Sequence, residues 1–268
     1  MTLGKRIADQ RFRGNYNKMK LNICTFALVL GTSTTLMAQT EEPATEAPAP
    51  APAVAATQPT VESPTADPGK IFIAARLGYA IPMGSSGKTS TGKDSAMSDY
   101  ITGMIPIGLD LGYMVTPNVM LGLYGQYGFV SLKDSACTGM SCSGSDLKFG
   151  VQGQYHISPT ENINPWVGVG VGYEIYSQKG TSGGAEISES LKGMEYLNLQ
   201  GGADFKLNSA VGIGPFINFS VGQYSSTSSK ISGMAPLIPD QDISQDIPSD
   251  RRTIHEWFTF GVRGAFKL

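Results

Sequence analysis

A two-residue alternation of apolar with small or polar side chains runs from about residue 70 to the end of the chain. It is clearest over residues 166–175, where valines, Tyr173 and Ile175 alternate with glycines and Glu174. Successive side chains of a β-strand point to opposite faces, so this period predicts strands with one apolar and one small or polar face. No segment has a convincing helical period. The pattern therefore predicts an all-β fold.

Eight segments follow this alternation, and short connections between them alternate strictly with long ones. This is typical of a barrel in the bacterial outer membrane, where tight periplasmic turns alternate with larger extracellular loops. The predicted fold is an eight-stranded antiparallel up-and-down transmembrane β-barrel with both chain ends in the periplasm. The predicted strands are 70–80, 100–115, 119–131, 146–157, 165–176, 191–207, 211–224 and 253–268; the short connections are 116–118, 158–164 and 208–210, and the long ones 81–98, 132–145, 177–190 and 225–252.

Aromatic residues on the apolar face favour a membrane barrel over a soluble one. Amphipathic rings prefer the membrane–water interface, so two bands of rings that bound an aliphatic belt indicate contact with lipid. A soluble ligand-binding barrel would instead place its large apolar side chains inside. The predicted aromatic girdles are Tyr113, Tyr155, Phe205 and Phe266 near the periplasmic ends, and Tyr79, Phe129, Tyr173 and Phe258 near the opposite ends.

The same parity directs several charged side chains into the barrel. An eight-stranded barrel has an interior just wide enough for side chains to fill it. Buried charges persist when they are paired, because an unpaired one is costly. We therefore predict an internal salt-bridge network that plugs the lumen. Its predicted members are Arg76, Asp110, Lys148, Glu174 and Arg263.

The first 69 residues differ in composition from the predicted barrel. A basic stretch, a short apolar run and the sequence Leu36-Met37-Ala38 predict a secretory signal peptide over residues 1–38, with Met19 as an alternative start. Residues 39–69 consist mainly of Pro, Ala, Thr, Glu and Ser, which predicts a disordered linker. The linker is interpreted as a tether, and the alternative is an arm that contacts the cell wall.

Two of the three cysteines, Cys137 and Cys142, lie in one polar segment. A close pair in an exported protein predicts a local disulfide. The segment offers too few ligands for a metal site, and the sequence gives no reason to expect a cofactor. The near balance of 20 basic and 22 acidic residues argues against nucleic acid as a partner.

The two histidines, His156 and His255, fall at opposite ends of the predicted barrel and cannot share a site. A lipid hydrolase would need a histidine beside a nucleophile, and His255 with Ser249 or Thr253 is the candidate pairing. We favour a histidine that caps the barrel rim, and we do not expect an enzyme.

Residues 70–268 resemble the OmpA/OmpW-type outer-membrane β-barrel domain. The run from Asn164 to Tyr173, Asn-Pro-Trp-Val-Gly-Val-Gly-Val-Gly-Tyr, is similar to that group's fifth-strand signature, and Gly261 to Phe266 resembles its terminal strand. The resemblance implies contact with outer-membrane lipid and handling by the barrel assembly machinery during biogenesis. The group usually ends in an aromatic residue, whereas this chain ends Phe266-Lys-Leu268.

The predicted function is a structural or surface-interaction role in the outer membrane, carried by long extracellular loops whose ligand the sequence does not identify. The alternative is a narrow channel for small or hydrophobic solutes. Glycines on the predicted inner face would leave room for such a path: Gly168, Gly170, Gly172, Gly212 and Gly214. A continuous salt-bridge plug supports the first function, and a gap lined by apolar side chains supports the second.

Overall fold

The computed structural model describes residues 70–89, 91–233 and 240–268. The predicted signal peptide and linker, residues 1–38 and 39–69, lie outside these ranges. The described chain is almost entirely β-structure, with three short 3₁₀ helices: η1 (Met97–Asp99), η2 (Asp134–Ala136) and η3 (Ser249–Arg251). Within the described ranges, none of the helices is long and apolar enough to cross a membrane.

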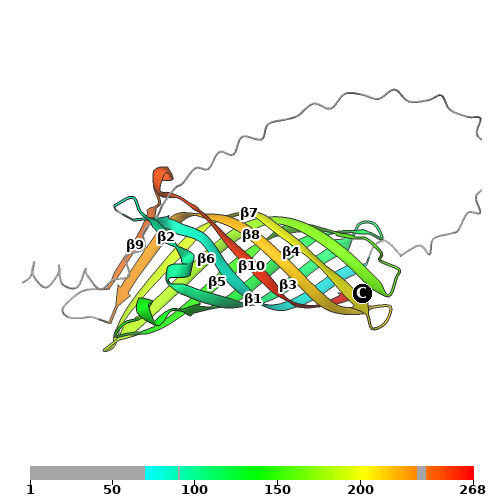
Figure 1. Cartoon of the computed structure of the whole chain (residues 1–268), viewed down its shortest axis with the longest axis horizontal. Coiled ribbons are helices and arrows are strands. Elements are labelled where there is room, and N and C mark those ends of the chain that lie inside the picture. Colours follow the sequence, from blue (N-terminus) through cyan, green and yellow to red (C-terminus); the bar gives the residue numbers. More distant parts are fainter. Residues whose placement is uncertain (1–69, 90, 234–239) are drawn as a thin grey trace, which may run out of the picture.

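Eight strands form a closed antiparallel ring, as predicted (Figure 1). Each barrel strand pairs with its neighbours along the chain, and β10 closes the ring by pairing with both β8 and β1. The closure continues to the chain end, where the Leu268 and Ile71 backbone amides each donate to the other's carbonyl, at 2.9 and 3.1 Å. The barrel strands are β1 (Ile71–Lys88), β3 (Ile101–Met114), β4 (Val119–Leu132), β5 (Ser141–His156), β6 (Ile163–Ser182), β7 (Ala185–Lys206), β8 (Val211–Ser232) and β10 (Ile254–Lys267).

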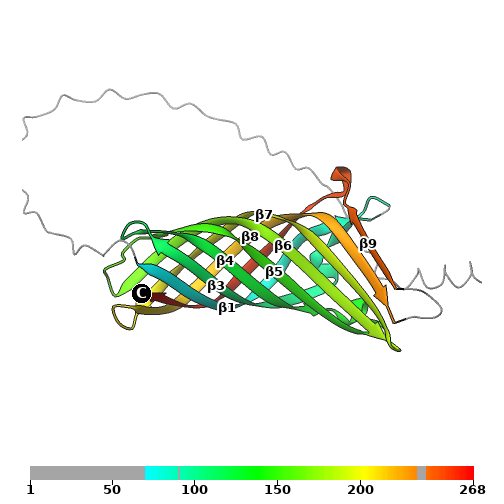
Figure 2. The same ribbon diagram turned by 180° about the vertical axis from the view of Figure 1, so that it is seen from behind.

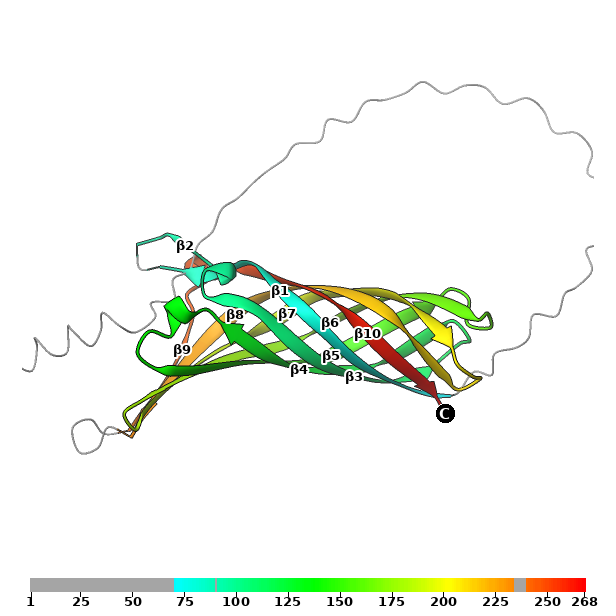
Figure 3. The same ribbon diagram turned by 60° about the horizontal axis from the view of Figure 1, so that its bottom comes forward.

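The two ends of the barrel differ. The short connections 115–118, 157–162 and 207–210 lie together with Lys70 and Leu268 at one end, which we call the turn end. At the other, the hairpin end, β2 (Asp94–Ala96) pairs with β1, and β9 (Gln241–Asp246) pairs with β8. Figures 2 and 3 show β9 extending the sheet of β6, β7 and β8 beyond the ring at this end.

Side chains alternate between the interior and the outer surface, as the period of two predicts. Along β6, for example, Val167, Val169 and Val171 are about half exposed, at 50, 52 and 46%. The residue Trp166, of the opposite parity, is 1% exposed. The outer surface carries a continuous apolar belt of aliphatic and aromatic side chains, which a soluble protein of this size would not expose. The belt therefore fits a lipid environment.

The sequence predicted long loops at the hairpin end, and the structure corrects part of this prediction. Residues 177–190 are no long loop, because β6 and β7 continue past the barrel and are joined by only Gly183 and Gly184. These two glycines have φ of +58° and +86°, the left-handed backbone that a two-residue hairpin turn requires. Likewise, the predicted loop 225–252 contains the end of β8 and the whole of β9.

Several strand glycines allow close contacts across the barrel wall. A Cβ at Gly172 would overlap the hydroxyl of Tyr124 and the carbonyl oxygen of Phe149. A Cβ at Gly214 would overlap the carbonyl oxygen of Ala203. The glycines on the inner face therefore give room to other side chains and to neighbouring strands.

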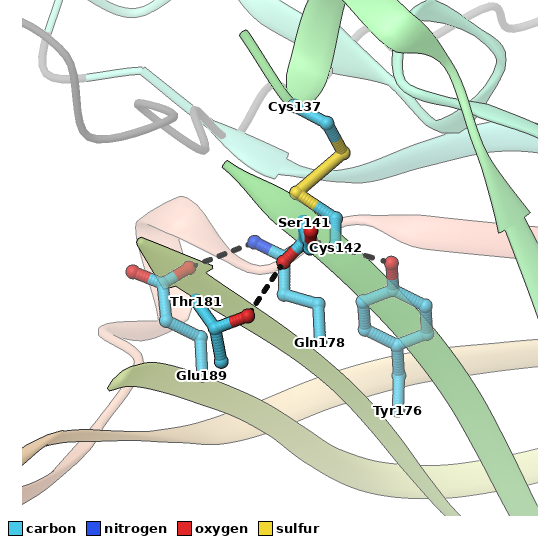
Figure 4. The surroundings of a disulfide bond; sticks show 7 residues. All are labelled: Cys137, Ser141, Cys142, Tyr176, Gln178, Thr181 and Glu189. Atoms are coloured by element: carbon cyan, nitrogen blue, oxygen red, sulfur yellow. Dashed lines mark hydrogen bonds between the residues drawn. A yellow bond between two sulfur atoms is a disulfide. The ribbon is translucent and has the colours of Figure 1, made fainter. Parts of the chain in front are cut away.

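The predicted disulfide between Cys137 and Cys142 is present, with Cα atoms 5.8 Å apart (Figure 4). It links η2 to the start of β5 at the hairpin end. Beside it, Gln178 donates to the carboxylate of Glu189 across the β6–β7 hairpin, at 3.1 Å. Burial raises the pKa of the Glu189 carboxyl, and the hydrogen bond from Gln178 opposes this shift.

The outward position of Val169 gives a test of lipid contact. We expect Val169→Arg to destabilise the barrel by about 2–4 kcal/mol, because a charge would face the bilayer near its middle. Urea unfolding of the protein refolded in phospholipid vesicles measures this cost, with Val169→Leu as the matched control. Equal stability of the two variants would show that this surface does not face lipid.

Candidate functional site

The candidate site is the polar interior of the barrel. All five charged residues of the predicted network are buried there, with exposures of 4% or less. Many further polar and charged side chains accompany them, most of which the sequence pattern did not single out. The additional buried polar residues include Asp146, Gln152, Gln154, Asn164, Glu195, Asn198, Gln200, Asp204, Asn218 and Ser220.

Glu174 on β6 is the centre of the largest group. One carboxylate oxygen, Oε1, accepts from the Tyr224 hydroxyl at 2.8 Å and from the Trp257 indole at 3.2 Å. The other, Oε2, lies 2.9 Å from Nε2 of His255 and 3.4 Å from Nζ of Lys148. The Tyr224 ring stacks on the His255 ring with centroids 4.0 Å apart, so side chains from β5, β6, β8 and β10 meet at one carboxylate.

Glu195 on β7 forms a second group that adjoins the first. It accepts from the Tyr124 hydroxyl and, at 2.8 Å, from the Asn198 amide, while Nζ of Lys148 lies 4.0 Å away. The Asn218 amide donates in turn to Asn198 at 2.5 Å. Lys148, which also donates to Ser220, therefore stands between two carboxylates.

A β-bulge explains why the sequence pattern missed Glu195. Both Tyr196 and Leu197 face outward, and the register of β7 shifts between Glu195 and Leu197. A strict period of two, counted from the turn end, would have placed Glu195 on the lipid face. A carboxylate at an apparently lipid-facing position was the signal of the bulge, because that placement is costly.

Arg76 and Asp110 form the third group, nearer the turn end. Arg76 Nη2 donates to Asp110 at 2.8 Å, and Nη1 donates to Gln200 at 3.0 Å. Gln200 donates to Gln152 at 2.7 Å, and Gln154 donates to the same oxygen at 3.3 Å. This group crosses the lumen from β1 and β3 to β5 and β7.

Arg263 is separate from the other predicted members. Its guanidinium lies over the Trp166 ring, 3.8 Å from the centroid, and 5.1 Å from that of Phe72. Its closest carboxylate oxygen, on Asp204, is 3.7 Å away, so the pair is an ion pair without a hydrogen bond. The structure thus joins Arg76 with Asp110 and Lys148 with Glu174, and leaves Arg263 in a cluster of its own.

The two histidines are both inside the barrel, which corrects the expectation that His255 caps the rim. His255 is 1% exposed and contacts Glu174. The candidate pairing with Thr253 is not formed, because the Thr253 hydroxyl donates to the Ser85 carbonyl at 2.6 Å. His156, near the turn end, contacts the Asn164 amide at 2.8 Å.

The eight residues of the predicted aromatic girdles lie on the outer surface in two bands. At the turn end, Tyr113 pairs in register with Ile71, Tyr155 with Val119, Phe205 with Ile163 and Phe266 with Val211, all beside the connections or the chain end. At the hairpin end, Tyr79 and Phe129 are exposed, and Tyr173 and Phe258 are half-buried. Their role at the lipid interface stays a prediction.

Among the described residues, no three His, Cys, Asp or Glu side chains are grouped to hold a metal ion.

A double-mutant cycle on Lys148 and Glu174 tests the interior network. We expect Lys148→Met and Glu174→Gln each to cost about 3–5 kcal/mol of unfolding free energy, because each strands a buried charge. The double variant should lose clearly less than the sum. Additive losses would contradict the pairing, and the exposed Glu161→Gln serves as the control, with an effect within about 0.5 kcal/mol.

Comparisons with known proteins are as follows. No protein-family model and no curated protein matches the sequence. Solved structures do match. A major outer membrane protein from Thermus thermophilus is 14% identical with a TM-score of 0.46, and 75% of this chain and 99% of that one are covered. The outer membrane protein OprG from Pseudomonas aeruginosa is 18% identical with a TM-score of 0.41, at 74% and 97% coverage.

The matches include an enzyme, the outer membrane protease OmpT from Escherichia coli, at 8% identity, a TM-score of 0.39 and coverage of 77% and 99%. At these levels of similarity, the fold is assigned from the chain's own architecture. Its ring of eight antiparallel strands and its apolar outer surface are the architecture of an eight-stranded transmembrane β-barrel.

Proposed function

We propose that this protein is a closed outer-membrane barrel with a structural or surface-interaction role, whose interior network blocks the lumen. The observation that carries the proposal is that side chains from all eight barrel strands meet in the interior. Groups centred on Glu174, Glu195 and Arg76 follow one another along the lumen and draw on every barrel strand.

Two of the inner-face glycines, Gly168 and Gly170, face larger side chains rather than open space. Atoms of Tyr124 and Gln152 lie within 3.3 Å of the Cβ positions of Gly170, and a Gln154 carbon lies 3.1 Å from that of Gly168. The space that small residues could have left open is thus filled by larger side chains from β4 and β5. This filling supports the closed lumen over the narrow channel.

The surface for interaction is the sheet that projects from the hairpin end. Strands β5 to β9 continue there, and one row of residues in register across them consists only of serines, with the Ser177 and Ser190 hydroxyls 2.8 Å apart. The row is Ser145, Ser177, Ser190, Ser228 and Ser244. It lies on the same outward face as the apolar belt, so it offers a flat hydroxylated surface directly beyond the lipid.

The proposed orientation puts the turn end, with Lys70 and Leu268, in the periplasm. Short turns in the periplasm and larger structures outside are the usual arrangement of such barrels. Outer-membrane lipid is then the permanent partner of the belt, with barrel assembly machinery acting during biogenesis. Contact between the predicted linker and the cell wall stays the alternative to a simple tether.

Conductance tests the closed lumen. In planar bilayers, we expect the refolded protein to show no large, stable conductance, because side chains fill the interior. Removing two of them, with Tyr124→Ala and Arg76→Ala together, should create measurable conductance. Tyr127→Ala, on the outer face of the same strand, is the control. Large, stable conductance of the unaltered protein would refute the closed lumen.

Cysteine labelling tests the orientation. In intact cells, a membrane-impermeant maleimide should label Ser244→Cys on β9, and should label Ser209→Cys only after the outer membrane is permeabilised. Cys137 and Cys142 are disulfide-bonded and give little background. The reverse pattern would invert the proposed orientation.

A further inference from the structure

The turn end of the lumen contains a pocket that the interior network does not fill. Its volume is about 170 Å³, and it is lined by residues from β7, β8 and β10 and from the connections of the turn end. Three lysines line it: Lys70, just before β1; Lys206, at the end of β7; and Lys267, at the end of β10. These positions follow one another around the ring, with β8 between Lys206 and Lys267.

The positive charge at this end is not balanced by the neighbouring side chains. Asp204 also lines the pocket, but it faces the buried Arg263 at 3.7 Å. Among the side chains that line the pocket, one carboxylate therefore stands with three lysines. A lumen surrounded by a low-dielectric wall strengthens such a field and attracts anions.

Unpartnered polar atoms cluster directly beside this pocket. Asp204 Oδ1 and Asn164 Oδ1 have no hydrogen-bond partner among the described residues, and both residues line the pocket at 3–4% exposure. Behind them, the three guanidinium nitrogens of Arg263 likewise lack one. Buried polar atoms are nearly always satisfied, so a concentration of unsatisfied ones points to a ligand.

We propose that the turn-end pocket binds a small phosphate-bearing molecule that also carries hydroxyl groups, of the glycerol phosphate class. The lysines supply charge-assisted hydrogen bonds to the phosphate oxygens. The hydroxyl groups donate to Asp204 Oδ1 and Asn164 Oδ1, which an anion without donors would leave unsatisfied. This chemistry is shared by free glycerol phosphate and by the headgroup of phosphatidylglycerol.

Calorimetric titration of the folded full chain in a neutral detergent tests the site without depending on whether the lumen conducts. The probes are sn-glycerol 3-phosphate, dihexanoyl phosphatidylglycerol, inorganic phosphate and glycerol. We expect saturable binding of sn-glycerol 3-phosphate or of dihexanoyl phosphatidylglycerol. Whichever of the two binds more tightly shows whether the ligand is free glycerol phosphate or a lipid headgroup. Either should bind more tightly than inorganic phosphate, and glycerol should not bind.

The variant Lys206→Gln with Lys267→Gln should weaken binding at least about tenfold, because two charge-assisted hydrogen bonds are lost. The matched control is Lys88→Gln with Lys93→Gln, two lysines at the hairpin end, which should leave binding unchanged. A third variant, Ala265→Leu, fills the pocket without changing its charge and should also weaken binding. Heat-modifiable migration on gels shows that each variant is folded.

Two results would overturn the proposal. The first is the absence of saturable binding of both glycerol phosphate probes to the folded protein. The second is an equal loss in the hairpin-end control, which would indicate only a general attraction of anions. If inorganic phosphate binds as tightly as glycerol phosphate, the hydroxyl groups do not contribute to binding. Asp204 and Asn164 would then not act as acceptors for the ligand.

Discussion

Closure of the sheet is the constraint on which the rest of this structure depends. Lipid offers no hydrogen bonds, so a strand that crosses a membrane needs a partner on each side. The pairing of β10 with β1 removes the last free edge, and it holds from the hairpin end to Leu268. Once the ring is closed with eight strands, one face must be apolar and the other has room only for side chains.

The narrow interior then explains why its polar groups gather around carboxylates. Each buried charge needs partners, and in a narrow barrel the opposite wall is close enough to supply them. Glu174 obtains them from three other strands and Glu195 from two, with Lys148 shared between both. Such contacts join strands that are not neighbours in the ring, so the network also braces the barrel across its width.

The eight-stranded ring could be predicted from the sequence because every barrel strand repeats one simple pattern. A period of two separates Val169 from Glu174 without any knowledge of neighbouring strands. It fails where a strand breaks the period, as at Glu195, since a bulge changes the parity of all later residues. The extended hairpin of β6 and β7 was also missed, because polar residues on both faces of a strand outside lipid look like a loop.

Contacts across the barrel could not be predicted from the sequence, for a different reason. The period places Glu174, His255 and Tyr224 by strand and face, but their meeting depends on the stagger of β6, β8 and β10, which short-range patterns do not encode. The same holds for Arg263. Its charge and parity suggested a member of the salt-bridge network, whereas the stagger places its guanidinium on the Trp166 ring.

The interior charges are distributed unevenly along the barrel, and this links the network to the turn-end pocket. Toward the hairpin end, Glu174 and Glu195 share Lys148, Glu174 also contacts His255, and Asp146 is buried. Toward the turn end, lysines are in excess along the pocket, and the nitrogens of the neighbouring Arg263 lack a hydrogen-bond partner among the described residues. If the lumen is closed as proposed, this electropositive end would hold an anion at the mouth of the barrel without passing it through.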